Sequence, residues 1–237
     1  MNHHVDEIAI QRRYYSETAT RYNEMHFQEA EHLFALSFFV GAINHFGLKS
    51  VLDVGSGTGR ALLYIKERRP DITVKGIEPV RELREMGYNM GLSKEELIEG
   101  DATAIDFDDG DFDAVSEFGV LHHLRRPHVA VSEMLRVAKE AIFISDDNNF
   151  GAGNFALRTS KQLLNSLGLW RAANYVKTGG KGYTISEGDG LSYSYSVFNN
   201  YKQIKSQCKS VHLLNTRNGH INPYRSASHV ALLGFKK

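Results

Sequence analysis

The sequence predicts a single α/β domain, spanning residues 1–237, with a mostly parallel sheet. Short apolar strands alternate with helical segments along residues 50–145, and this order indicates right-handed βαβ units. The first of these strands runs directly into a glycine-rich turn, where α/β folds of this kind place their ligand. A length of 237 residues suits one such domain with an inserted segment.

Two helices are expected before the sheet, at 8–28 and 31–46. The second contains the longest mainly apolar run of the chain, which is shorter than the about 20 residues that cross a bilayer and therefore predicts a buried helix. The elements expected next are, in order, strand 50–54, helix 59–69 ending before Pro70, strand 73–77, helix 80–90, strand 96–99, strand 112–117, helix 127–138 and strand 141–145.

The regular alternation stops after the strand at 141–145. Residues 146–195 are rich in Gly, Asn, Ser and Tyr, and only one helix, at 155–173, is expected there. A helix at 196–208 and strands at 211–216 and 229–235 follow. Because the connection between these two strands leaves no room for a helix, the strands should run antiparallel.

The amino-acid composition argues against a nucleic-acid partner and indicates a reducing compartment. The 28 basic and 28 acidic side chains balance, so the chain lacks the excess positive charge that is typical of proteins that bind nucleic acid. The single cysteine, Cys208, cannot form an internal disulfide, and we therefore expect a reducing cytoplasm. No membrane span and no nucleic-acid partner are expected, and the oligomeric state stays open.

The strongest functional pattern is the turn after the first strand. Asp53 lies one residue before the end of that strand, which is followed by a G-x-G-x-G turn formed by Gly55, Gly57 and Gly59. Glycines let a backbone turn sharply and approach a ligand closely, and the next helix offers free N–H groups. A dinucleotide site would use G-x-G-x-x-G instead. An aspartate next to the turn suits an amino group better than a phosphate.

Two further acidic positions follow at later strand ends. Glu78-Pro79 comes at the end of the second strand, where a carboxylate can accept hydrogen bonds from both hydroxyls of a ribose. Asp101-Ala102 follows the third strand, where a carboxylate can accept from an adenine amino group. Each acid alone could be a solvated loop residue, but their order along successive strands favours one nucleoside site.

At these residues the chain resembles the class I S-adenosylmethionine-dependent methyltransferases, especially those that act on small molecules. The matching segments are 51–59, 76–79, 100–102 and 112–124. The resemblance implies a Rossmann-like seven-stranded sheet in the order 3-2-1-4-5-7-6 with strand 7 antiparallel, and N-terminal cap helices over 1–46. The implied cofactor contacts are Asp53, Gly55, Ser56, Gly57 and Gly59 for the methionine part, Glu78 and Pro79 for the ribose, Asp101 and Ala102 for the adenine, and Glu117 near the methionine end.

The segment around Tyr14 and Tyr22 is similar to the cap that closes over the cofactor in this family. Aromatic faces attract a sulfonium cation by about 0.5–2 kcal/mol, although such tyrosines can equally pack the cap helix on the domain. His122 and His123 follow the fourth strand, where an imidazole could act as general base. The alternative is that this pair orders the loop or lines the pocket.

The 146–195 segment is expected to be a lid that binds the acceptor, because it follows the fifth strand at the open edge of the sheet. Its candidate acceptor contacts are Asp146, Asp147, Asn148, Tyr183, Tyr193 and Tyr195. Rings mixed with hydrogen-bonding groups suit a sugar, and the segment 182–196 resembles methyltransferases associated with bacterial surface glycans. Glu117, Asp147 and Asn148 could form an all-oxygen Mg²⁺ site, but we expect no metal because the rest of the sequence does not resemble metal-dependent enzymes.

We therefore expect methyl transfer from S-adenosylmethionine to an oxygen or nitrogen of a small polar acceptor, with S-adenosylhomocysteine as product. Two alternatives remain. An NAD(P)-dependent oxidoreductase could use the same fold, but the glycine spacing and the lack of a Tyr-x-x-x-Lys pair disfavour it. A non-catalytic cofactor-binding module is the other alternative.

Overall fold

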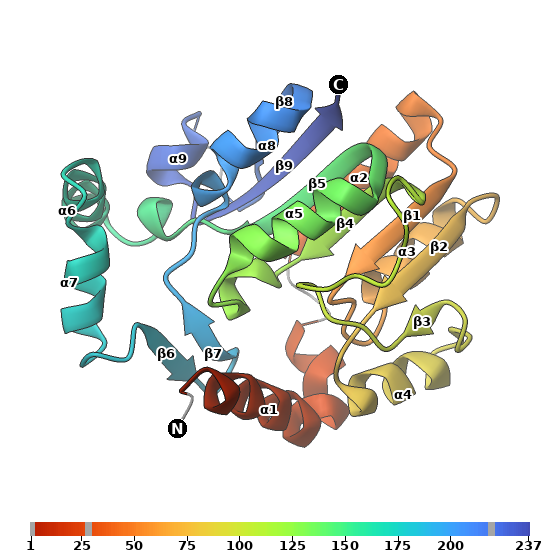
Figure 1. Cartoon of the computed structure of the whole chain (residues 1–237), viewed down its shortest axis with the longest axis horizontal. Coiled ribbons are helices and arrows are strands. Elements are labelled where there is room, and N and C mark those ends of the chain that lie inside the picture. Colours follow the sequence, from red (N-terminus) through yellow and green to blue (C-terminus); the bar gives the residue numbers. More distant parts are fainter. Residues whose placement is uncertain (1–2, 27–29, 218–220) are drawn as a thin grey trace.

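The computed structural model describes residues 3–26, 30–217 and 221–237, with the backbone alone described at 3–6, 20 and 22–26. Its centre is a seven-stranded sheet in the order β3-β2-β1-β4-β5-β9-β8 (Figure 1). The strands are β1 (Ser50–Val54), β2 (Thr73–Ile77), β3 (Leu97–Ile98), β4 (Phe112–Phe118), β5 (Ala138–Asp147), β8 (Cys208–Asn215) and β9 (His229–Lys236). This order confirms the predicted Rossmann-like α/β sheet.

The pairing of the strands also agrees with the prediction. β1 pairs in parallel with both β2 and β4, whereas β9 runs antiparallel to β5 and to β8. The connection between β8 and β9 does contain a short helix, α9 (Pro223–Ser226), which the sequence analysis excluded. Pro223 suits the first turn of such a helix, because its missing N–H has no partner there anyway. Four residues do not cross the sheet, so the strands still run antiparallel.

Helices cover both faces of the sheet, and alternate residues of each central strand face opposite layers. Leu52 and Val115 belong to the cluster that packs against α5 (Pro127–Val137) and α8 (Tyr201–Gln207). Their neighbours Val51 and Ala114 belong to the cluster that packs against α2 (Ala30–Phe46) and α3 (Arg60–Arg68). Strands buried on both faces explain the nearly continuous apolar runs in the sequence. Among the described residues, none of the helices combines the length and apolarity that crossing a bilayer requires.

The segment after β5 is more regular than expected. The helix expected at 155–173 is two helices, α6 (Phe155–Ser166) and α7 (Trp170–Lys177), separated by Gly168 at a φ of 72°. A left-handed glycine ends a helix at low cost, and this is the signal that the sequence analysis overlooked. A hairpin of β6 (Tyr183–Ser186) and β7 (Gly190–Tyr193) follows. Short 3-10 turns occur at Leu121–His123, Asn149–Gly151 and Val197–Asn199.

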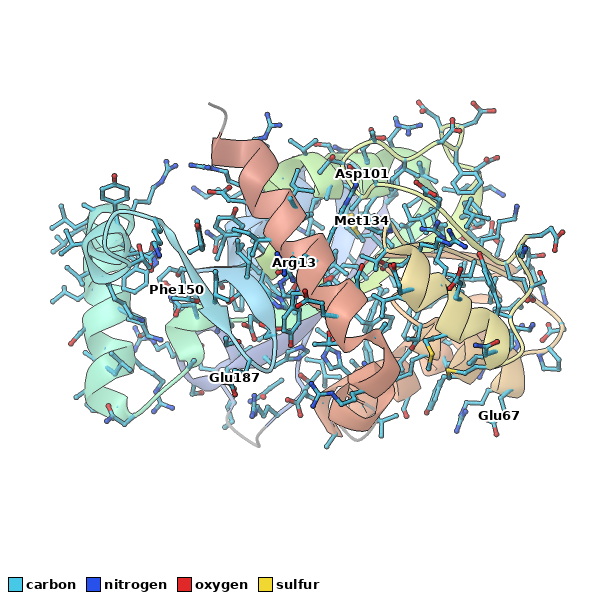
Figure 2. The ribbon with its side chains drawn as sticks, turned by 90° about the horizontal axis from the view of Figure 1, so that it is seen from below. Arg13, Glu67, Asp101, Met134, Phe150 and Glu187 are labelled. Atoms are coloured by element: carbon cyan, nitrogen blue, oxygen red, sulfur yellow. The ribbon has the colours of Figure 1, made fainter. Side chains whose placement is uncertain are left out.

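The N-terminal helix α1 (His3–His26) lies against two segments that are distant in sequence. It contacts α4 (Arg81–Asn89), which follows β2, and it contacts β7 of the hairpin. Figure 2 shows α1 lying between α4 and the hairpin that carries Glu187. The helix and the hairpin thus meet over the carboxyl ends of the parallel strands, where an α/β fold binds its ligand.

Candidate active site

A cavity of about 190 Å³ lies between α1, the glycine turn and the ends of β2 and β4. Eight of the residues expected at the site line it: Gly55, Gly57, Glu78, Pro79, Asp101, Ala102, His123 and Tyr193. Helix α1 contributes side chains that the sequence analysis did not select, among them Glu7, Gln11 and Tyr15. The glycine turn, the two acidic strand ends and the N-terminal helix therefore share one site.

Two positions of the glycine turn require glycine, because of their backbone conformation and because neighbouring side chains leave no room for a Cβ atom. Gly55 and Gly59 have φ values of 68° and 78°, in the left-handed region that L side chains rarely adopt. A Cβ on Gly55 would lie 2.5 Å from Val120 Cγ2, and one on Gly59 would lie 2.1 Å from Leu92 Cδ1. Gly55 therefore brings the backbone against the wall of the cavity, whereas Gly59 packs the start of α3 on the domain.

The Glu78 carboxylate links the glycine turn to the second strand. One oxygen accepts from the Gly57 N–H at 3.0 Å and the other accepts from the Val80 N–H at 2.9 Å. Burial raises the pKa of Glu78 to about 7, against the lowering effect of these two hydrogen bonds. A carboxylate offers about four lone-pair sites. Glu78 lines the cavity and can still accept hydrogen bonds from a bound diol.

Asp101 and Ala102 lie at the wall of the cavity next to Thr103. One Asp101 oxygen accepts from both the backbone N–H and the hydroxyl of Thr103, each at 2.7 Å. This turn fixes the carboxylate while only one of its oxygens is engaged in these bonds. The arrangement suits recognition of a heterocycle with an amino group, as predicted for adenine.

Asp53 lies behind the glycine turn rather than on the cavity surface. Its carboxylate accepts from the Ser116 hydroxyl at 2.8 Å, and its backbone carbonyl accepts from the Ser56 hydroxyl at 2.9 Å. Burial raises the pKa of Asp53 to about 7. The structure therefore places Asp53 and Ser56 as supports of the turn, and direct contact with the cofactor stays a prediction for both.

Two polar groups expected at the site are occupied by internal hydrogen bonds. The carboxyl group of Glu117 accepts from the N–H groups of Val120 and Ser145 at 2.9 and 3.1 Å, and the side chain is fully buried. Burial and then the nearby Asp146 raise the pKa of Glu117 well above its ordinary value. The Asn148 amide donates to three backbone carbonyls near α9, and its oxygen accepts from Ser196. Neither residue lines the cavity.

His122 is held between two carboxylates. Its Nδ1 lies 2.7 Å from Asp146 Oδ1, and its Nε2 lies 3.3 Å from Asp189 Oδ2. Burial disfavours a charge on this ring, but the Asp146 carboxylate outweighs that effect and raises the pKa of His122 well above its usual value. With both nitrogens engaged and the proton retained, His122 is poorly suited to accept a proton from a substrate.

His123 lines the cavity and has a different environment. Its Nδ1 lies 2.7 Å from the Leu191 carbonyl and 3.0 Å from the Gln11 amide nitrogen. Because a carbonyl can only accept, we assign the ring proton to Nδ1 and take Nε2 as the acceptor nitrogen. Nε2 accepts from the Tyr15 hydroxyl at 2.8 Å. Burial and then the charge on His122 lower the pKa of His123. The ring is therefore neutral near pH 7, and its lone pair points at a tyrosine that also faces the cavity.

Within the described part of the chain, one cluster brings three possible metal ligands together. Atoms of His122, His123 and Asp189 lie within 4.8 Å of one another. The residues named in the sequence analysis for an oxygen site do not join this cluster, because Glu117 and Asn148 use their polar atoms internally. The His123 Nε2 in the cluster already accepts from Tyr15.

The hairpin is attached to α1 through an acidic residue. Tyr193 donates to Glu7 Oε2 at 2.8 Å, and Arg125 donates to both oxygens of the same carboxylate at 2.9 and 3.0 Å. Glu7 is 5% exposed, whereas the Arg125 side chain is 47% exposed, so the acid is buried and its arginine partner reaches the solvent. Among the predicted acceptor contacts, Tyr193 is the one that lines the cavity.

The other predicted acceptor residues lie elsewhere. Tyr195 is buried in the core and donates to Asn200 Oδ1 at 3.0 Å. Tyr183 packs edge-on against Tyr193 but does not line the cavity. Asp146 is fully buried, where it accepts from the Leu121 N–H as well as from His122, and the exposed Asp147 is also absent from the lining.

The cap contributes a different tyrosine from the one expected. Tyr14 donates to the Glu187 carbonyl at 2.7 Å and does not line the cavity, whereas its neighbour Tyr15 does. The side chain of Tyr22 lies outside the described residues. A four-residue spacing places Glu7, Gln11 and Tyr15 on one face of a helix. That spacing was the signal in the sequence that could have identified all three.

Comparisons with known proteins agree with this geometry. Residues 52–143 match the family model described as a methyltransferase domain. A demethylmenaquinone methyltransferase of Roseiflexus castenholzii is 32% identical over 89 residues, which are 37% of each chain. An ajmaline N-methyltransferase of Rauvolfia serpentina is 35% identical over 95 residues, 38% of this chain and 32% of that protein. The chain thus spans about a third of the length of these two curated relatives.

Solved structures extend the likeness to nearly the whole chain. A methyltransferase of Thermotoga maritima, described as a possible histamine N-methyltransferase, superposes with a TM-score of 0.57 at 18% identity, over 95% of this chain and 99% of that one. A plantazolicin methyltransferase solved with S-adenosylhomocysteine superposes with a TM-score of 0.58 at 14% identity, over 99% of this chain and 98% of that one. At such identities the structures show the fold. Residues 52–143 are thus similar in sequence to a methyltransferase domain, and the chain has the fold of the solved methyltransferases.

Proposed function

We propose that the chain transfers a methyl group from S-adenosylmethionine to an oxygen or nitrogen of a small polar acceptor, of which a sugar is one candidate. The observation that carries the proposal is the single cavity that joins Glu78 and Asp101 to the Tyr15–His123 pair. One end of the cavity has the acids that suit a nucleoside, and the other has a hydrogen-bonded pair that can accept a proton.

The cofactor would lie along the strand ends in the order that the sequence suggests. Glu78 would accept from the ribose hydroxyls, and Asp101 with the Ala102 backbone would bind the adenine. The turn at Gly55 and Gly57 would approach the methionine part closely, supported from behind by Asp53. Charge-assisted hydrogen bonds of this kind contribute about 1.5–3 kcal/mol each.

The protein's main task in the reaction is positioning. A methyl group on a sulfonium is already activated, so the site must hold the acceptor atom in line with the S–CH3 bond at about 3–3.5 Å and exclude water. For a hydroxyl acceptor, Tyr15 would take the acceptor proton as it passes its own to His123 Nε2. His123 would then hold the proton gained by the enzyme, while the methyl group moves from sulfur to oxygen.

The hairpin and α1 are proposed as the lid and cap of the acceptor side. We assign residues 146–195 and 1–46 to these roles within one domain, because Tyr193 and Glu7 connect the two segments across the cavity. Tyrosines, a carboxylate and Arg125 next to one another suit a polyhydroxylated acceptor. The relatives named above act on unlike acceptors, so their names do not select one. A reducing cytoplasm is the proposed compartment, since the one cysteine, Cys208, is a buried thiol.

The decisive experiment is a comparison of ligands followed by an acceptor screen. Calorimetric titration should show binding of S-adenosylmethionine and S-adenosylhomocysteine, and none of NAD or NADP. Incubation with S-adenosylmethionine labelled on the methyl group and a panel of sugars and amines should transfer label to at least one acceptor. Binding of NAD in preference to S-adenosylmethionine would overturn the proposal in favour of an oxidoreductase. Cofactor binding with no transfer to any acceptor would favour the non-catalytic module.

A further inference from the structure

The surface of helices α6 and α7 carries an unusual share of exposed apolar side chains. Seven large hydrophobic residues on these helices and their joining loop are between 50% and 78% exposed. They are Phe155, Leu157, Leu163, Leu167, Leu169, Tyr175 and Val176. We call these seven residues the α6–α7 surface. Figure 1 shows the two helices standing apart from the sheet. Concentrated exposed apolar residues of this kind mark an interaction site.

The same part of the chain has a strongly one-sided charge. Residues 148–186 contain five basic side chains and no aspartate or glutamate, whereas the whole chain balances 28 against 28. Lys161 is buried, where its amino group donates to the carbonyls of Asn149 and Ala152. The other four, Arg158, Arg171, Lys177 and Lys181, reach the solvent. Apolar side chains surrounded by cations are typical of a surface that meets an anionic partner.

A groove between α6 and α9 adds a second, independent feature. It has a volume of about 580 Å³ and is lined by Arg158 and Arg225, by the hydroxyl groups of Thr159 and Tyr224, and by Phe155. The Thr159 hydroxyl already donates to the Phe155 carbonyl at 2.8 Å. The two arginines are the groups that suit a phosphate, because arginine binds phosphate oxygens through paired N–H groups. The apolar surface therefore adjoins a site with the chemistry of a phospholipid headgroup.

The basic side chains of this surface favour an anionic bilayer over a second copy of the chain as the binding partner. A second copy of the chain in a two-fold pairing would bring the same basic side chains face to face, and like charges at an interface are unfavourable. An anionic bilayer removes the conflict, because each basic residue near such a surface adds to the attraction. Apolar side chains can meanwhile enter the boundary between headgroups and acyl chains.

We propose that the α6–α7 surface docks peripherally on an anionic phospholipid bilayer and that the groove between α6 and α9 receives a headgroup phosphate. The proposal goes beyond methyl transfer and does not depend on it. The chain passes from α7 into the hairpin whose Tyr193 lines the cavity. Docking at α6–α7 therefore places a bilayer at the helix that directly precedes this hairpin in the chain.

The test is flotation of the full chain with vesicles, without cofactor or acceptor. Vesicles of phosphatidylcholine with phosphatidylglycerol should bind the protein, and vesicles of phosphatidylcholine alone should bind at least tenfold less. The double variants Leu163→Gln/Leu167→Gln and Lys177→Glu/Lys181→Glu should each lower binding at least tenfold. Matched controls are Leu213→Gln/Ile221→Gln, which alter exposed apolar residues elsewhere, and Lys202→Glu/Lys209→Glu. Both controls should bind like the parent protein.

Several outcomes would overturn the proposal. Equal binding to neutral and anionic vesicles, or equal loss in the control variants, would remove the role of this surface. A parent protein that stays unbound to both vesicles would do the same. Sedimentation equilibrium showing a dimer that Leu163→Gln/Leu167→Gln dissociates would make the surface an interface between copies. The melting temperature and the affinity for S-adenosylhomocysteine should be the same in the variants and in the parent protein. These two controls show that a loss of vesicle binding is not caused by unfolding or by damage to the cofactor site.

Discussion

The phenol of Tyr193 donates to the carboxylate of Glu7 at 2.8 Å, although the two residues are 186 positions apart in the chain. Arg125 pairs with the same carboxylate from the loop after β4. The hairpin, the N-terminal helix and the central domain therefore meet at one buried acid. Breaking this contact should loosen the acceptor side of the cavity and leave the strand ends that would bind the cofactor in place.

Tyr193→Phe should lower kcat/KM for the acceptor by about tenfold, the effect of losing about 1.4 kcal/mol in one well-placed contact. The dissociation constant for S-adenosylhomocysteine should change less than threefold, on the order of 0.6 kcal/mol. Tyr183→Phe is the matched control, because its ring packs on Tyr193 without lining the cavity. Steady-state kinetics and calorimetry measure the two effects.

Tyr195 serves as the contrast, since the sequence analysis gave it the same role. Its ring belongs to the core, so Tyr195→Ala should instead destabilise the fold, by about 3–5 kcal/mol as for other large-to-small core changes. Equal weakening of cofactor binding and turnover by Tyr193→Phe would assign the hairpin to the cofactor site instead of the acceptor side.

Glu78→Gln should weaken S-adenosylhomocysteine binding at least tenfold, because an amide cannot replace a carboxylate that accepts on both oxygens. The loss of charge-assisted hydrogen bonds accounts for about 1.5–3 kcal/mol. Gly57→Val should have a similar or larger effect, since Gly57 has a φ of 57° and lines the cavity. Glu99→Gln, an exposed acid on the same side, is the control. Unchanged calorimetric binding by well-folded Glu78→Gln and Gly57→Val proteins would contradict the assignment.

The pKa of Glu78 predicts how stability depends on pH. Burial raises this pKa from 4.5 to about 7, so between these pH values the folded protein keeps a proton that the unfolded chain has released. Stability from Glu78 is therefore present below pH 4.5 and is lost as pH rises towards 7. The shift corresponds to about 3 kcal/mol, at about 1.4 kcal/mol per pKa unit.

Glu78→Gln should remove that part of the pH dependence. Urea unfolding without ligand should be measured for both proteins at pH 5 and pH 8. The free energy of unfolding of the variant, relative to that of the parent protein, should be higher at pH 8 than at pH 5 by at least about 1 kcal/mol. A constant difference in the free energy of unfolding between the two proteins at both pH values would show that Glu78 is ionised in the folded state throughout.

Activity should survive EDTA once an acceptor is found. Of the oxygen ligands considered from the sequence, Glu117 and Asn148 are engaged internally, and His123 Nε2 in the other cluster accepts from Tyr15. Turnover in chelator should stay within about twofold of the untreated rate, on the order of 0.4 kcal/mol. Complete loss, restored by one added divalent metal, would contradict this. His122, His123 and Asp189 would then be the first residues to mutate as ligands.

The order of the sheet was predicted from the family resemblance, and local patterns predicted the direction of its strands. Alternating strands and helices indicated a mostly parallel sheet, and the short final connection indicated that the last two strands are antiparallel. The structure has that arrangement. The hairpin of β6 and β7 was not predicted, although Tyr183-Thr184-Ile185-Ser186 alternates apolar and polar residues, because each strand is only four residues long and lies in a segment rich in glycine and serine. Gly168 was overlooked as the end of α6.

Among the candidate site residues, those that could be predicted from the sequence are the ones whose place is set by the position of the backbone at a strand end. Glu78, Asp101 and the glycines follow strand ends, and parallel strands bring those ends together. Asn148 and Tyr195 looked like acceptor contacts because they are polar residues near the fifth strand, but long-range packing turns both inward. The choice of Tyr15 over Tyr14 depends on how α1 is rotated against the domain, and adjacent tyrosines give no local signal for that rotation.

The Tyr15–His123 pair leads to the sharpest prediction about catalysis. The Leu191 carbonyl fixes the His123 tautomer, and Nε2 is left to accept from Tyr15. For a hydroxyl acceptor, Tyr15→Phe should lower kcat by about 100-fold or more, as expected when a general base loses its route to the substrate. S-adenosylhomocysteine affinity should fall less than threefold, on the order of 0.6 kcal/mol. The change removes one oxygen atom and keeps the ring that packs near Val80 and Leu83.

Tyr14→Phe is the matched control, because the Tyr14 hydroxyl donates to the Glu187 carbonyl outside the cavity. It should leave kcat within about twofold of the parent value, on the order of 0.4 kcal/mol. His123→Gln should reduce kcat as Tyr15→Phe does, and the double variant should be no slower than either single variant if the two residues act as one relay. Independent, additive losses on a hydroxyl acceptor, or full activity in Tyr15→Phe, would show that the proton leaves by another route.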